Sequence, residues 1–221
     1  MILSSLPPTP ANPALINSHS ILERADEAAE ALFTAFETVR RARNAKGTAT
    51  DHEQDLLRAA LVLAAAGLDA MVKQLVRDTL GLILTKQEGA QRQFTGFIQS
   101  RLRREEQVDI RFLAEALAAE RPMMHLRAEL VRELTGASLQ SVDQLLKVAA
   151  SFAIPADEIT KDPKHLRTVF EARNQIAHEM DILFGQPNRG RRQRARKTMH
   201  EYTKLVLSVG KSFYTAVEKR L

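Results

Sequence analysis

The stretch AALVLAAAGL, residues 59–68, is the longest apolar run of the chain and decides its fold class. Because the run is apolar on every side, a helix that contains it should lie at the centre of a helical bundle. Thr50 and Glu53 have capping-box spacing, so this helix should begin at Asp51, and we expect it to reach about Asp78. Ten apolar residues fall short of the roughly 18 that a membrane span requires, so we expect no transmembrane segment.

Helix caps and apolar spacing predict further helices on both sides of this run. A capping box at Ser20 should open a helix that runs to about Asn44. Asp162 before Pro163 is typical of a helix start, and that helix should reach about Asp181. Other helices are expected within residues 91–102, 111–118, 122–136, 138–152 and 191–218. No segment alternates between apolar and polar residues as a strand does, so the sequence predicts an all-α fold.

Length and composition fit one soluble domain of 221 residues. Residues 1–17 contain four prolines and should form a flexible N-terminal arm, while 18–221 should form a single helical domain with a helical insertion at 86–137. The chain has no cysteine, which excludes disulfides and cysteine nucleophiles and is compatible with a reducing cytoplasm. Lysine and arginine number 32 against 27 aspartates and glutamates, and this net charge of +5 favours a polyanionic partner.

An arginine interrupts the apolar stripe of the helix expected after Pro163. Arg173 stands among apolar residues at helical spacing, where a charge is costly unless it is paired or serves a site or interface. His178 follows five residues later, and Asn174 precedes His178 by four, so its amide could orient the imidazole. Glu171 and Asp181 should extend this polar face on either side. The alternative is structural: the arginine reaches solvent, and the histidine suits the negative end of the helix.

The string RNQIAHEMD, residues 173–181, resembles the signature of the HEPN superfamily of small all-α domains, many of them metal-independent ribonucleases. Within it, LVLAAAGLDAMVKQLVRD, residues 61–78, resembles the early helix of the RiboL-PSP-HEPN group. The segment from SLQSVDQLLKVAASF, residues 138–152, to the last helix resembles the C-terminal half of that group. Residues 1–17 and 86–137 lie outside the resemblance, which implies a HEPN-like antiparallel helical bundle with additional helices.

The resemblance implies an RNA endonuclease that needs no metal or cofactor and is a toxin or phage-defence effector. Arg173 would hold the phosphate, because its guanidinium stays charged and binds two oxygens. His178 would transfer protons, since its ordinary pKa lies near neutral pH, and Asn174 would assist. The product would be a 2′,3′-cyclic phosphate. The resemblance also includes an acid at Asp69, although Lys73 offers it a surface ion pair instead.

Helix geometry favours a two-fold arrangement of this site. Five residues on a helix turn by about 140° and rise about 7.5 Å, so Arg173 and His178 should diverge unless the helix unwinds near Ala177. Two copies that face each other across a two-fold axis would bring the groups together. Since HEPN nucleases are commonly dimers with a composite cleft, we expect a homodimer that buries Arg173, with an antitoxin or defence-system protein as a possible further partner.

The basic run RGRRQRARK, residues 189–197, is the second candidate for RNA contact. Positive charge at the start of a helix opposes the macrodipole and should bring no local stability, which favours phosphate binding over a solvated helix face. The predicted RNA-binding residues are Arg189, Arg191, Arg192, Arg194, Arg196 and Lys197. Most aromatic residues have core spacing, so no base-stacking surface is expected.

Two other classes of function stay open. The first is a non-catalytic helical module that binds RNA or a protein in a toxin–antitoxin or defence complex. The second is a DNA-binding helical protein, for which no helix-turn-helix spacing is present. HExxH, P-loop and GxGxxG motifs are absent, so zinc hydrolases, nucleotide triphosphatases and dinucleotide enzymes are unsupported, and we expect no metal site and no membrane partner.

Overall fold

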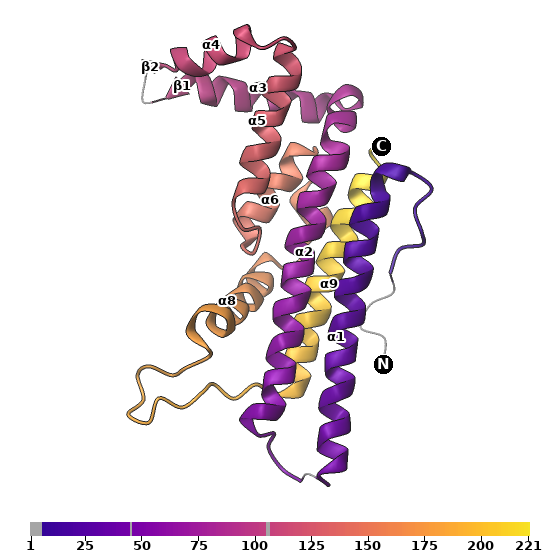
Figure 1. Cartoon of the computed structure of the whole chain (residues 1–221), viewed down its shortest axis with the longest axis vertical. Coiled ribbons are helices and arrows are strands. Elements are labelled where there is room, and N and C mark those ends of the chain that lie inside the picture. The colour runs from indigo at the N-terminus through magenta and orange to yellow at the C-terminus, as the bar shows by residue number, and fades with distance from the viewer. Residues whose placement is uncertain (1–5, 45, 105–106) are drawn as a thin grey trace.

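Three long helices form the body of the computed structural model, which describes residues 6–44, 46–104 and 107–221 (Figure 1). They are α1 (Ile16–Ala42), α2 (Asp51–Lys86) and α9 (Arg196–Glu218). Helix α1 is antiparallel to α2, whereas α9 runs in the same direction as α2 (Figure 1). The fold is all-α, as expected, with α2 packed against both α1 and α9.

The apolar run lies in α2, where Ala60, Leu61, Ala64 and Ala65 are fully buried. The capping box at its start is confirmed: the Glu53 amide donates to Thr50 Oγ1 at 3.3 Å, and the Thr50 amide donates to Glu53 Oε2 at 2.7 Å. Helix α2 extends past the expected end at Asp78, because the residues after it, among them Leu80 and Ile83, continue to be buried.

Helix α2 is long and apolar enough, by length and composition, to cross a membrane, which differs from the expectation that no segment qualifies. That expectation rested on the length of the unbroken apolar run, whereas the mean hydropathy of a longer segment stays high even when the segment contains a few polar residues. Half of the residues in that window are buried inside the fold. The central helix of a folded bundle passes the same test of length and composition.

The chain becomes helical earlier than the proline-rich start predicts. A 3-10 turn, η1 (Pro13–Leu15), leads directly into α1, so Ser20 lies inside a helix and does not cap one. Leu15 is fully buried, and the Pro7 carbonyl lies 3.0 Å from the His19 ring. Residues 13–17 are therefore helical, which differs from the flexible arm expected over 1–17; residues 6–12 contain no helix or strand, and 1–5 lie outside the described residues.

The 86–137 segment forms a helical arm at one end of the bundle (Figure 1). It contains α3 (Glu88–Leu102), β1 (Arg103–Arg104), β2 (Gln107–Val108), α4 (Ile110–Ala118) and α5 (Pro122–Gly136). The two-residue strands pair in an antiparallel turn that the sequence did not predict. Helices α6 (Val142–Ser151) and α7 (Ala156–Ile159) then lead back to the body.

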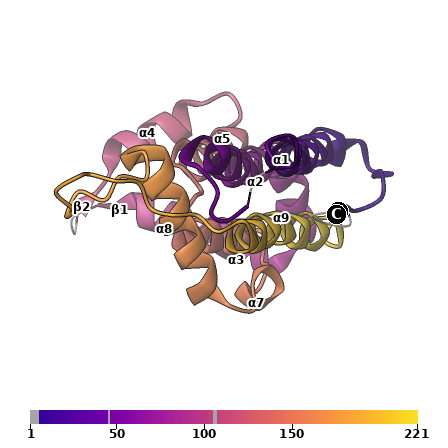
Figure 2. The same ribbon diagram turned by 90° about the horizontal axis from the view of Figure 1, so that it is seen from below.

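Helix α8 (Pro163–Glu179) carries the candidate site and projects to one side of the three long helices (Figure 2). The predicted cap is confirmed, since the His165 amide donates to Asp162 Oδ1 at 2.9 Å. The helix ends before Asp181, because Met180 and Asp181 both adopt left-handed backbone angles. The following segment stays irregular up to Ala195, so α9 begins later than the expected residue 191.

Candidate active site

Arg173 and His178 contact each other within one copy of the chain. Arg173 Nη1 lies 3.3 Å from His178 Nε2, although α8 remains helical through Glu179. The expectation that the two side chains diverge is therefore wrong. The backbone positions do point apart, but the arginine side chain is long enough to run along the helix surface to the imidazole.

The contact bears on the tautomer of His178. A guanidinium can only donate, so a hydrogen bond between the two groups requires His178 Nε2 to accept, with the ring proton on Nδ1. Arg173 Nη1 also donates to Asn174 Oδ1 at 3.1 Å. Asn174 therefore orients the arginine, whereas the sequence suggested that it would orient the imidazole.

The environment of Arg173 differs from that of an ordinary surface arginine. The side chain is half-buried while Asn174 and His178 are exposed. Burial lowers the pKa of Arg173, and the nearby Asp69 charge raises it in part. Among the described residues, no ion pair joins Arg173 to a carboxylate, and its buried Nε has no hydrogen-bond partner. A partly desolvated cation with no carboxylate in direct contact suits the binding of an anion.

Asp69 is near this pair but is occupied by two other partners. Lys73 Nζ lies 2.9 Å from Asp69 Oδ2, which confirms the ion pair expected from their spacing. The Leu139 amide donates to Asp69 Oδ1 at 2.6 Å. Asp69 thus fixes the start of the segment that leads into α6 and supplies negative charge behind Arg173.

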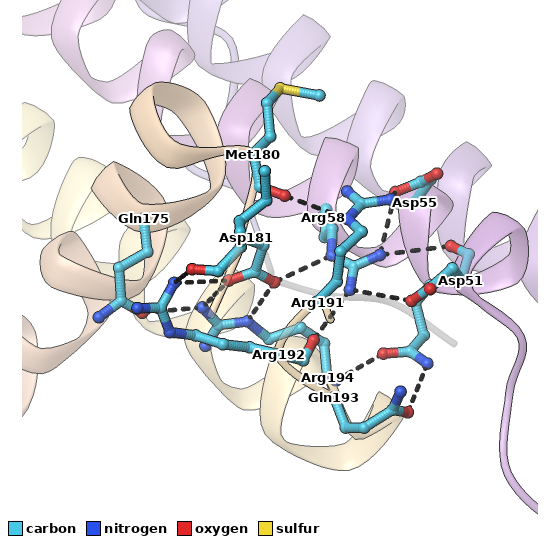
Figure 3. Close-up of polar contacts among 12 residues, drawn as sticks. Asp51, Asp55, Arg58, Gln175, Met180, Asp181, Arg191, Arg192, Gln193 and Arg194 are labelled. Carbon is cyan, nitrogen blue, oxygen red and sulfur yellow. Dashed lines mark hydrogen bonds and ion pairs between the residues drawn. The ribbon is translucent and has the colours of Figure 1, made fainter. Parts of the chain in front are cut away.

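Glu171 and Asp181 do not form one polar face with the pair. Glu171 is exposed on α8, whereas Asp181 is fully buried. The expectation that Asp181 extends the exposed polar face is wrong, because the left-handed turn after α8 directs it into the protein (Figure 3). Its carboxylate lies 2.9 Å from Arg58 Nε, 2.9 Å from Arg194 Nε and 2.5 Å from Arg194 Nη2. Burial alone would raise the pKa of Asp181, but hydrogen bonds from Arg194 and Arg58 hold it below its usual value.

The basic run is largely paired within the chain. Four of the six predicted RNA-binding residues meet carboxylates: Arg191 with Asp55, Arg192 with Glu179, Arg194 with Asp181, and Arg196 with Glu37. The expectation that these cations bring no local stability is therefore wrong, since they hold the segment between α8 and α9. Arg189 and Lys197 are exposed and make no ion pair within the described part of the chain.

Arg58 is the important residue that sequence reasoning missed. It is 2% exposed, and besides Asp181 it contacts Asp55 at 3.0 Å and the Arg192 carbonyl at 2.9 Å. A signal was present, since Arg58 follows the buried Leu57 on the most apolar helix. The reasoning that singled out Arg173, a charge on an apolar stripe, applies equally here.

Within residues 6–44, 46–104 and 107–221, no group of three or more histidine, aspartate or glutamate side chains could hold a metal ion. The chain matches no model of a known protein family, no curated protein and no solved structure.

Proposed function

We propose that the chain is an RNA endonuclease of the HEPN type that uses no metal. The observation that carries the proposal is the 3.3 Å contact between Arg173 and His178 at an exposed face of α8. The half-buried guanidinium has no carboxylate partner among the described residues, and the imidazole beside it is open to solvent. The RNQIAHEMD resemblance agrees with this assignment of roles.

The chemistry begins with the unprotonated Nε2 of His178. This nitrogen removes the proton from a ribose 2′-hydroxyl, which attacks the adjacent phosphorus. Arg173 turns from His178 to the phosphate and neutralises the charge that develops on its oxygens, with Asn174 holding the guanidinium. The bond from phosphorus to the 5′-oxygen breaks, and the products carry a 2′,3′-cyclic phosphate and a 5′-hydroxyl.

The leaving 5′-oxygen requires a proton from a second group. In the proposed arrangement a second copy of the chain provides it: an isologous contact around α8 would bring the two His178 rings to one phosphate. The homodimer is therefore part of the proposal. A role as a cytoplasmic toxin or phage-defence effector is also proposed, and it rests on the resemblance. Sedimentation of the wild type and of Arg173→Glu tests the dimer, and a strictly monomeric wild type contradicts it.

The test of activity is incubation with total RNA in EDTA, with identification of the new termini. We expect the wild type to produce 2′,3′-cyclic phosphate ends and both Arg173→Gln and His178→Ala to lose cleavage. His165→Ala is the matched control, since His165 is an exposed histidine on the same helix without an arginine contact. Equal cleavage by His178→Ala would contradict the assignment.

The same experiment distinguishes the non-catalytic alternative. If neither the wild type nor His178→Ala cleaves RNA, yet both retain it in a gel shift, the chain is a binding module. The ion pairs of the basic run bear on such binding, because phosphate contact by Arg191, Arg192, Arg194 or Arg196 competes with a carboxylate of the same chain.

A further inference from the structure

The segment after α8 folds into a projecting hairpin, residues 182–191, which we name the finger. Ile182 and Arg191 form an isolated β-bridge, and the Leu183 amide donates to the Gly190 carbonyl at 2.8 Å. The tip is closed by the Gln186 amide on the Leu183 carbonyl at 3.1 Å. Figures 1 and 2 show this segment extending away from the three long helices, on the side of α8.

The base of the finger is fixed to the end of α8 that carries His178. The Arg192 amide donates to the Asp181 carbonyl at 2.8 Å, and Arg191 Nε donates to the Met180 carbonyl at 3.1 Å. Asp181 is in turn buried against Arg58 of α2 (Figure 3). Because the anchor is a buried ion-pair cluster two residues beyond the glutamate that ends α8, the finger and His178 share one rigid support.

The exposed side chains of the finger are aromatic, amide and cationic. Phe184 is 64% exposed, so it differs from the majority of the aromatic residues, whose core spacing led us to expect no base-stacking surface. Arg189 and Gln186 are also exposed, and residues 182–191 contain no aspartate or glutamate. Met180, 62% exposed, points away from the ion-pair cluster (Figure 3) and adds apolar surface at the base.

We propose that the finger binds an unpaired nucleobase of the RNA next to the scissile phosphate, with Phe184 stacked on the base and Arg189 on a flanking phosphate. Single-stranded RNA offers splayed bases to aromatic side chains, whereas the bases of a duplex are stacked on one another. A surface with a cation and no carboxylate suits a polyanion. This inference rests on the proposed function and assigns its substrate class: single-stranded RNA or an unpaired loop.

The test measures binding in the full-length His178→Ala protein, which removes cleavage from the readout. The probe is a 12-nucleotide RNA with one 2-aminopurine, used alone and annealed to its complement. We expect Phe184→Ala to weaken binding of the single strand about 5- to 100-fold and to leave duplex binding unchanged. Phe184→Tyr should keep the affinity, because it keeps the ring. The matched control is Leu117→Ala, which removes a side chain that is 70% exposed on α4.

Several other outcomes overturn the inference. The inference fails if Phe184→Ala binds the single strand as tightly as the parent protein does. It also fails if Phe184→Ala loses as much affinity for the duplex as for the single strand, or if the parent protein binds no RNA. If Phe184→Ala changes its oligomeric state in sedimentation while its RNA affinity stays unchanged, the finger contacts a second copy of the chain. If the wild type cleaves RNA and Phe184→Ala binds normally, only the finger fails. If the wild type does not cleave and Phe184→Ala loses binding, only the nuclease fails.

Discussion

Replacement of Asp181 by asparagine tests whether the buried ion-pair cluster holds α8 to the body of the bundle. Asparagine keeps the shape of the side chain but removes the charge shared by Arg58 and Arg194. Asp181 is fully buried, and Arg58 is 2% exposed. Removal of one partner of a buried pair typically costs about 3–5 kcal/mol, because the other charge is left without compensation.

The structure places the expected loss at the lower end of that range. Arg58 retains Asp55 at 3.0 Å and Asp51 at 3.6 Å, so part of its charge stays compensated. We therefore expect Asp181→Asn to lower the free energy of unfolding by about 3 kcal/mol. In a chain of this length, that loss lowers the midpoint of thermal unfolding by about 6–12 °C.

The pH dependence of the free energy of unfolding gives a second measure of how much the cluster stabilises the fold. Because the pKa of Asp181 is lower in the folded chain, its stabilising contribution is present above the unfolded pKa, near 3.8, and is lost as the pH falls through the folded value. The difference between the wild type and Asp181→Asn should thus be full at pH 7 and narrow below about pH 4.

The assay is urea unfolding followed by circular dichroism at pH 7, with Glu27→Gln as the control. Glu27 is half-exposed and pairs with the exposed Arg24 on α1, so its replacement should change the free energy by no more than about 0.5 kcal/mol. A loss below about 1 kcal/mol in Asp181→Asn, or equal losses in the two variants, would refute the reasoning.

Three further predictions concern other parts of the fold. A Cβ on Gly67 would overlap the Cβ of Ala25, so Gly67→Ala should lower the free energy of unfolding by about 1–3 kcal/mol. A Cβ on Gly81 meets open space, so Gly81→Ala should raise the free energy of unfolding by up to about 1 kcal/mol. Urea unfolding measures both. Thr50→Ala removes the capping box and should cost about 1 kcal/mol by the same assay. Burial lowers the pKa of His200, so stability should fall as the pH drops below about 6.5, and His200→Gln should flatten that slope between pH 7.5 and 5.5.

Local signals predicted the parts of the fold that local interactions decide. The capping box at Thr50 and the Asp162 cap are confirmed, because each depends only on residues three positions apart. The start of α1 was wrong, because the Asn12 side chain caps a 3-10 turn that leads into α1 and buries Leu15. The end of α2 was wrong because burial beyond Asp78 continues the helix.

The sequence likewise predicted only part of the candidate site. The apolar stripe singled out Arg173, and the spacing to His178 showed that one helix carries both groups. Their 3.3 Å contact required the actual path of the arginine side chain. Asp181 was placed on the wrong side, because two successive left-handed residues reverse the direction of the backbone after the helix.

By itself, the sequence determined that this protein is all-α, that α2 is its central helix, and which helix carries the arginine–histidine pair. These properties follow from the periodicity of apolar residues and from caps, which act over a few positions of the chain. Only the tertiary structure decided that the basic run is paired with carboxylates and that Asp181 is buried against Arg58. The partners in that cluster lie 123 positions apart, so no local pattern links them, and only the packing of α8 on α2 brings them within hydrogen-bond distance.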